Sequence, residues 1–178
     1  MLETQRLRIR PWRKADHRAF VRLVQDPEMM RYVTHGRTWS DSDVGEFIER
    51  QARHLDRHGF CFGALERIAD GRVVGLAGMQ PHDDGEIELG WWIWKAFWGL
   101  GYATEAARAL IEYARDGLGL KRLVAVIEPP NTASVRVAEK LGMRRECIKP
   151  ASETIARRDD TPIGYYTLAL ENAESAES

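Results

Sequence analysis

A strand, a glycine turn and a helix follow one another between residues 91 and 115, and this run constrains the fold most. The strand-like part is rich in tryptophan, and the turn carries Gly99 and Gly101. Directly afterwards, apolar residues recur at helical spacing: Ala103, Ala106, Ala107, Leu110, Ile111 and Ala114. Glycines let backbone N–H groups approach a ligand, and a helix N-terminus favours negative charge. The run therefore predicts an anion site, with phosphate as the natural candidate.

The charge balance argues against a polyanion as the partner. The chain has 178 residues, with 26 basic and 27 acidic side chains and a formal net charge of −1. No global positive field exists to hold a nucleic acid, so that class of function is disfavoured. No apolar run approaches the roughly 20 residues that cross a bilayer, and no signal peptide opens the sequence. We therefore expect a cytoplasmic protein with no membrane partner.

The cysteines and histidines do not suggest a metal site or a disulfide. Cys61 and Cys147 lie far apart and outside any metal-ligand spacing, so we expect two buried thiols. Four histidines show no paired spacing, and we expect them at the surface: His35, His54, His58 and His82. The sequence therefore predicts no metal.

Hydrophobic periodicity predicts one α/β domain over residues 1–170, followed by a frayed acidic tail at 171–178. The element order is βααβββαβαββ. The helices fall at 16–26, 41–58, 102–116 and 131–141, with an irregular stretch at 28–39, and Asp16 can cap the first helix. Expected strands are 6–10, 60–66, 72–80, 86–94, 123–127, 143–148 and 164–170. The three consecutive strands form an antiparallel meander, and 123–127 lies beside the strand that ends near residue 94.

Two familiar phosphate loops do not fit the glycine turn. A dinucleotide-binding loop needs a third glycine or alanine where Thr104 stands, and an acidic residue where Lys121 and Arg122 stand. A Walker A loop needs Gly-Lys-Ser/Thr after the turn, which is absent. The anion is therefore bound in another type of strand–turn–helix.

The segments GWWIW and WGLGYATEA, with Asn131-Thr-Ala-Ser134 and EKLGM further on, resemble the GNAT superfamily of acyl-CoA-dependent N-acyltransferases. The opening residues 2–10, LETQRLRIR, resemble the usual start of its Rim type, which acetylates ribosomal-protein N-termini and has relatives acting on other amines. The resemblance covers about residues 2–170. It implies a mixed, mostly antiparallel sheet flanked by helices, with two splayed central strands that hold the pantetheine arm of acetyl-CoA.

The resemblance also assigns the cosubstrate site. Trp92, Ile93 and Trp94 border the pantetheine and thioester, while Asn131 and Ser134 contact the CoA from the later helix. Backbone N–H groups hold the pyrophosphate, and they belong to Trp98, Gly99, Leu100, Gly101, Tyr102, Ala103 and Thr104. Trp98 stands where the superfamily usually has Gln or Arg, so a side-chain contact to phosphate is in question there.

The implied reaction is direct attack of a neutral amine on the thioester, which needs a base, an oxyanion donor and an acid. The family's oxyanion donor is a backbone N–H near Trp92 or Ile93. Ser134 matches the acid, although a serine at this helix position also bonds its own backbone. Glu88 and Glu153 are two candidate bases, each equally compatible with a solvated carboxylate, and water chains alone also serve in some members.

The acceptor site is expected between the irregular segment 29–39, residues 88–91 and the loop after Cys147. Four tryptophans either line an apolar groove there or fill the core: Trp91, Trp92, Trp94 and Trp98. The leading function is an acetyl-CoA-dependent N-acetyltransferase acting on a peptide N-terminus or a small amine, as monomer or homodimer. The alternative is a domain that binds acyl-CoA without turnover, as a sensor.

Overall fold

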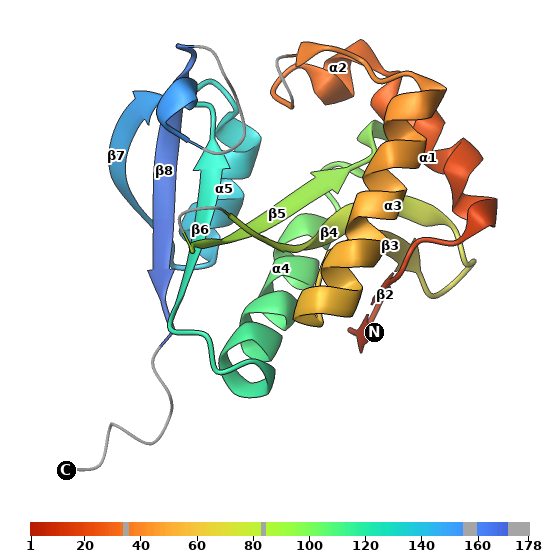
Figure 1. The fold of residues 1–178 in the computed structure, drawn as a ribbon, viewed down its shortest axis with the longest axis horizontal. Coiled ribbons are helices and arrows are strands. Elements are labelled where there is room, and N and C mark those ends of the chain that lie inside the picture. Colours follow the sequence, from red (N-terminus) through yellow and green to blue (C-terminus); the bar gives the residue numbers. More distant parts are fainter. Residues whose placement is uncertain (34–35, 83–84, 155–159, 171–178) are drawn as a thin grey trace.

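The computed structural model describes residues 1–33, 36–82, 85–154 and 160–170 (Figure 1). Its strands form one eight-stranded sheet in the order β1-β2-β3-β4-β5-β6-β8-β7. The pairing of β5 with β6 is parallel and the other neighbouring pairs are antiparallel. The expected α/β class with a mostly antiparallel sheet is therefore confirmed. The tail at 171–178 lies outside the described residues, so the domain boundary at 170 stays a prediction.

The strands match the expected ones, with small shifts at their ends. A short strand before residue 6 was not anticipated, because two residues carry no periodicity. The strands are β1 (Leu2–Glu3), β2 (Leu7–Arg10), β3 (Phe62–Arg67), β4 (Val73–Pro81), β5 (Ile87–Ile93), β6 (Arg122–Ile127), β7 (Arg144–Pro150) and β8 (Pro162–Ala169). The predicted meander is β3–β4–β5.

Several helices begin and end at residues with the expected capping chemistry, but Asp16, expected to cap the first helix, provides no side-chain cap to it: its carboxylate accepts hydrogen bonds from Arg10 and Arg13 instead. The helices are α1 (His17–Val24), α2 (Pro27–Met30), α3 (Asp41–His58), α4 (Tyr102–Glu112) and α5 (Thr132–Lys140). Ser40 caps α3 through a hydrogen bond from the Asp43 N–H, and Gly59 ends it in the left-handed conformation. A π-helical turn, η4 (Tyr113–Gly117), extends α4. Part of the stretch expected to be irregular is the helix α2, which begins at Pro27 after an Asp26 cap.

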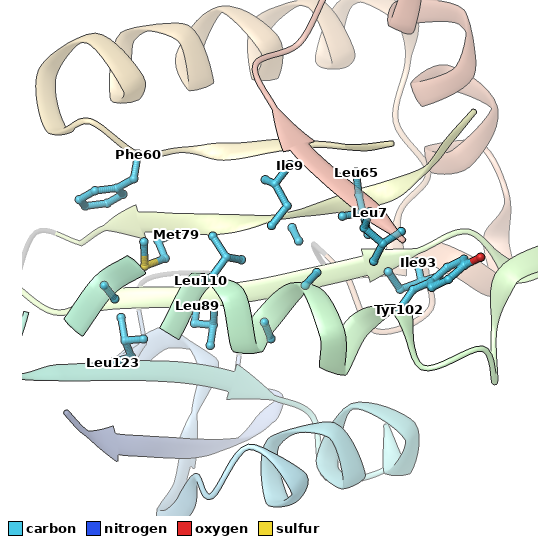
Figure 2. Close-up of a cluster of buried hydrophobic side chains, with 14 of the residues drawn as sticks. Leu7, Ile9, Phe60, Leu65, Met79, Leu89, Ile93, Tyr102, Leu110 and Leu123 are labelled. Carbon is cyan, nitrogen blue, oxygen red and sulfur yellow. The ribbon is translucent and has the colours of Figure 1, made fainter. Parts of the chain in front are cut away.

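The helices cover the two faces of the sheet separately. Helix α4 packs on one face, where Leu110 and Tyr102 meet side chains of the central strands such as Leu89 (Figure 2). Helices α1, α2 and α3 cover the other face around Phe20 and Phe47. Helix α5 packs against β6 and β8 through a third, smaller cluster. Each face therefore has its own apolar core.

The central strands β5 and β6 part from each other almost at once. Their register contains a single pair, Glu88 with Val124. Beyond it β5 pairs only with β4 and β6 only with β8, and the two strands diverge in Figure 1. The splayed pair implied by the family resemblance is present, because beyond the Glu88–Val124 pair no strand among the described residues pairs with the β6 side of β5.

Two expectations about burial are wrong. Cys147 is exposed, because it lies on the edge strand β7, and Cys61 is only partly buried. Burial raises the pKa of the Cys61 thiol to about 11. His82, expected at the surface, is buried, and His54 and His58 are half-buried. His35 lies outside the described residues.

Candidate active site

The glycine turn connects the free end of β5 to helix α4. After Ile93 the chain makes a single 3₁₀ turn, η3 (Lys95–Phe97), and then passes through Gly99 and Gly101. Both glycines have positive φ, 76° and 79°. Residues with a Cβ rarely adopt that conformation, which is why glycine occupies both positions. Helix α4 begins at the next residue, Tyr102.

The turn presents a run of backbone N–H groups without protein partners. In the described part of the chain, no hydrogen bond is formed by the N–H groups from Gly99 to Thr104. The first donor bonded inside this helix is the Glu105 N–H, which lies 3.0 Å from the Gly101 carbonyl oxygen. Consecutive free donors at a helix N-terminus can hold a doubly charged phosphate group. The turn therefore fits the pyrophosphate of a CoA.

Trp98 is placed differently from the other predicted donors. Its backbone N–H already donates to the Lys95 carbonyl oxygen at 3.1 Å. Its indole Nε1 donates to the Ile93 carbonyl oxygen at 2.6 Å. Both donors of Trp98 are thus occupied, and the residue fastens the turn to the end of β5. The residue as a whole remains 47% exposed.

The hydrogen-bond alternation in β5 separates the two candidate oxyanion donors. The Trp94 N–H donates to the Val74 carbonyl oxygen of the β4 side at 2.8 Å. In an antiparallel ladder every second residue forms its backbone hydrogen bonds with the same neighbouring strand, so the Trp92 N–H also points to β4. The N–H groups of Trp91 and Ile93 then point to the β6 side, where the strands have parted. Of the predicted pair, Ile93 is the one that offers a free N–H there.

The tryptophans of this region do not line one common groove. The Trp92 ring packs on the α3 face, with centroids 5.6 Å from Trp39 and 6.2 Å from Phe47. Trp91 packs on the opposite face, against the clusters beneath α4 and α5. Neighbouring residues of a strand point to opposite faces, so adjacent tryptophans necessarily separate. Trp92 therefore belongs mainly to the core.

Helix α5 brings Asn131 and Ser134 together at its N-terminus. The Asn131 Oδ1 accepts the Ser134 N–H at 3.2 Å and so caps the helix. The Ser134 side chain is half-buried, and its hydroxyl forms no hydrogen bond to the residues that the structure describes. The alternative in which this hydroxyl bonds its own helix backbone is therefore not observed. Ser134 has a hydroxyl available for another partner.

Glu88 lies where β5 and β6 begin to part, and it is held by two side chains of the β4 end. Its Oε2 accepts the Gln80 Nε2 at 2.8 Å and lies 2.9 Å from the His82 Nε2. The side chains of Glu88 and His82 are 12% and 2% exposed. Glu88 is thus not a solvated surface carboxylate. His82 was missed in the sequence, although residues 80, 82 and 88 alternate onto one face of a hairpin, a signal that identifies such a group.

The second candidate base, Glu153, has a different environment. It is exposed and lies in the 3₁₀ turn η5 (Ala151–Glu153) after β7. Residues 155–159, which follow it, lie outside the described residues. Neither carboxylate role is tested by this geometry, but only Glu88 is held in place by hydrogen bonds in the described parts of the chain.

Two broader features of the described residues bear on the class of site. They contain no group of three or more His, Cys, Asp or Glu side chains arranged to hold a metal ion. No helix within these same residues has the length and apolar character needed to cross a membrane.

The sequence matches the family model described as the acetyltransferase (GNAT) domain over residues 6–144. It is 31% identical over 169 residues to the protein YkkB of Bacillus subtilis, covering 93% of each chain. It is 29% identical to YnaD of the same species, which is named as an uncharacterized N-acetyltransferase, covering 85% of this chain and 90% of YnaD.

A solved structure agrees with the sequence comparison. The fold superposes on a GNAT-family acetyltransferase from Bacillus anthracis with a TM-score of 0.81 and 27% sequence identity, covering 96% of this chain and 99% of the other. The chain therefore belongs to the GNAT acetyltransferase family. The predictions of an acyltransferase enzyme and of acetyl-CoA as the donor are confirmed at this level, because acetyl-CoA is the acyl donor of the family.

Proposed function

We propose that this protein transfers the acetyl group of acetyl-CoA to a primary amine, on a peptide N-terminus or a small molecule, within a ternary complex. The observation that carries the proposal is the run of free N–H groups from Gly99 to Thr104 beside the open edge of β5. A diphosphate needs several hydrogen-bond donors and no competing carboxylate. The backbone N–H groups of this turn alone supply the donors.

The chain offers a group for each demand of the reaction. The amine must lose a proton before its nitrogen attacks the thioester carbon, and Glu88 is the proton acceptor, oriented by Gln80 and His82. The Ile93 N–H donates to the carbonyl oxygen as negative charge develops there. When the carbon–sulfur bond breaks, the Ser134 hydroxyl donates a proton to the departing sulfur. The nitrogen of the new amide loses its extra proton to solvent, and solvent returns a proton to Ser134.

The acceptor is expected on the face of the sheet that carries Glu88. Side chains of even-numbered β5 residues share that face with α1, α2 and α3, because Trp92 packs there. The segment between α2 and α3 borders the same face, although residues 34–35 lie outside the described residues. The Rim-type character rests on the motifs at residues 2–10 and 131–143, and it favours a peptide N-terminus among the amines. A cytoplasmic location stays a prediction.

The test is thiol release from acetyl-CoA with a panel of amines. The panel includes short peptides with free N-termini, the same peptides with blocked N-termini, polyamines and amino sugars. We expect release with at least one free amine and none with its blocked form. Tight acetyl-CoA binding without turnover on any amine would instead identify an acyl-CoA sensor. Absence of acetyl-CoA binding would remove the whole proposal.

A further inference from the structure

A cluster of contacts joins the N-terminal segment to the first turn of α4. The Glu105 carboxylate accepts hydrogen bonds from the Thr4 hydroxyl at 2.6 Å, the Arg6 backbone N–H at 3.0 Å and the Arg6 Nε at 2.6 Å. The Arg6 Nη2 lies 2.5 Å from the same carboxylate. Both oxygens of Glu105 are therefore engaged by residues about a hundred positions away in the sequence.

Arg6 also contacts the glycine turn directly. Its Nη1 donates to the Leu100 carbonyl oxygen at 3.1 Å, and its guanidinium carbon lies 4.8 Å from the centroid of the Tyr102 ring. The peptide bond between Leu100 and Gly101 is trans, so its C=O and N–H point in opposite directions. Fixing the Leu100 carbonyl toward Arg6 therefore directs the Gly101 N–H away from Arg6. That N–H is one of the free donors of the turn.

The N-terminal turn at residues 4–7, which carries the Thr4 and Arg6 side chains, is anchored by its own hydrogen bonds. The Thr4 N–H donates to the Leu7 carbonyl oxygen at 2.8 Å, and the Leu7 N–H donates to the Thr4 hydroxyl at 3.0 Å. The Leu7 side chain is fully buried in the core beneath α4. The backbone at Arg6 is thus anchored by contacts that do not involve the glycine turn.

The charges of the cluster matter for a bound diphosphate. Burial raises the pKa of Glu105, but hydrogen bonds from Thr4 and Arg6 outweigh it, so the pKa lies below the ordinary 4.5 and the group is ionised at neutral pH. An ionised carboxylate in the first turn of α4 would repel a phosphate bound there. The Arg6 guanidinium cancels that repulsion.

We propose that Thr4, Arg6 and Glu105 form a clamp that positions the phosphate-binding turn, so that the N-terminal segment sets the affinity for the diphosphate part of acetyl-CoA. This inference rests on the proposed function of the turn. These are positioning residues: Arg6 acts through the Leu100–Gly101 peptide and through the charge of Glu105. The ion pair is partly exposed, with side chains 45% and 19% accessible, so its contribution to stability is small.

The test compares Arg6→Ala with Arg8→Ala. Arg8 is a matched control because it lies on the same segment and pairs with Glu3 and Glu66 instead of the turn. We expect Arg6→Ala to raise the Kd for CoA, measured by calorimetry, about 10-fold. The reason is that the Gly101 N–H would no longer be directed at the phosphate, and losing a hydrogen bond to a charged group costs about that factor. The kcat at saturating acetyl-CoA and the KM for the amine should stay within about 2-fold of wild type.

A truncated donor separates positioning from a general structural effect. S-acetylpantetheine lacks the diphosphate, so its rate of use should be equal in the wild type and Arg6→Ala. Two results would overturn the clamp: an equal loss of activity in Arg6→Ala with acetyl-CoA and with S-acetylpantetheine, or an unchanged Kd for CoA in Arg6→Ala. Arg6→Lys is the second variant, in case Arg6→Ala folds poorly. It keeps the charge but not the forked contact, so its Kd for CoA should lie between those of the wild type and Arg6→Ala. Failure of the wild type to bind CoA would instead overturn the proposed function.

Discussion

At the scale of single residues, the hydroxyl of Ser134 carries one specific role in the proposed reaction, as the acid for the departing sulfur. It is half-buried at the start of α5 and bonds to no described residue. Ser134→Ala should lower kcat about 100-fold while the Kd for acetyl-CoA is nearly unchanged, because the hydroxyl acts on the departing sulfur and not on the bound donor. Single-turnover kinetics and calorimetry measure the two quantities separately.

Thr132→Ala is the control for Ser134. Thr132 is exposed in the same helical turn, so its loss should leave both kcat and affinity unchanged. An unaltered kcat in Ser134→Ala would remove this residue from the mechanism.

The carboxylate of Glu88 is the second residue with a specific expected role. Glu88→Gln keeps a side chain of the same size but cannot accept the ammonium proton, so we expect kcat to fall about 100-fold with little change in the KM for acetyl-CoA. Glu86→Gln is a matched control, since Glu86 is paired with Arg122 at 3.3 Å. Full activity of Glu88→Gln, with loss in Glu153→Gln, would transfer the role to Glu153.

At the scale of the element, the glycine turn needs both its left-handed backbone and its free N–H groups. Gly101→Val places a β-branched residue at a φ of 79°, which strains the backbone by about 1–2 kcal/mol and redirects the donors. We expect the Kd for CoA to rise at least about 10-fold in a folded protein. Calorimetry measures the Kd, and circular dichroism monitors the fold.

Gly119→Val distinguishes strain from function. Gly119 has a φ of 63° with no atom within 4 Å of an added Cβ, and it lies beyond the other end of α4. Both variants should lose similar stability, but only Gly101→Val should lose affinity. Equal affinities in the two variants would contradict the assignment of the turn.

At the scale of the whole molecule, a buried ion cluster ties β2 to β3 and to the segment before α1. The Arg10 guanidinium donates to Asp16 at 2.6 and 2.9 Å and to Glu66 at 2.7 Å. These side chains are 3%, 7% and 7% exposed. Asp16 was expected to cap α1, but its carboxylate instead accepts from Arg10 and from the Arg13 N–H. Removing Arg10 would leave the buried Asp16 carboxylate with only the Arg13 N–H, while Glu66 would keep its hydrogen bond from Arg8.

Arg10→Met should therefore lower the free energy of unfolding by about 3 kcal/mol at pH 7. Burial raises the pKa values of Asp16 and Glu66, but hydrogen bonds and charge interactions with Arg10, Arg13 and Arg8 together outweigh it and leave both below the ordinary 3.8 and 4.5. Groups with depressed pKa values stabilise the fold above their ordinary pKa, and this contribution is lost as the pH falls through the folded pKa. The difference between variant and wild type should thus shrink below about pH 4.

Urea denaturation between pH 3 and pH 7 measures that difference. Arg115→Met is the control, because its ion pair with Asp116 is on the surface and should contribute little to the free energy of unfolding. A pH-independent difference for Arg10→Met would show that lost packing, and not charge, causes the destabilisation.

The sequence by itself determined the elements whose signals are local. Periodicity predicted β3 to β6 and α3 to α5, and Gly99 and Gly101 predicted the turn, because a positive φ and a helix start depend on neighbouring residues. The motifs shared with the family lie on the same strand, turn and helix, and so predicted the same part of the fold. Two-residue β1 and the environment of Asp16 were not predictable in this way, since nothing near them in the sequence specifies their partners.

Only the tertiary structure decided which distant side chains meet. It paired His82 with Glu88, packed Trp92 against Trp39 and Phe47, and joined Arg6 to Glu105, which lie 99 positions apart in the sequence. The register of a sheet and the packing of a helix on it set such contacts, and neither is written in a local window. The glycine turn was therefore visible in the sequence, while the residues that hold it and Glu88 in place were not.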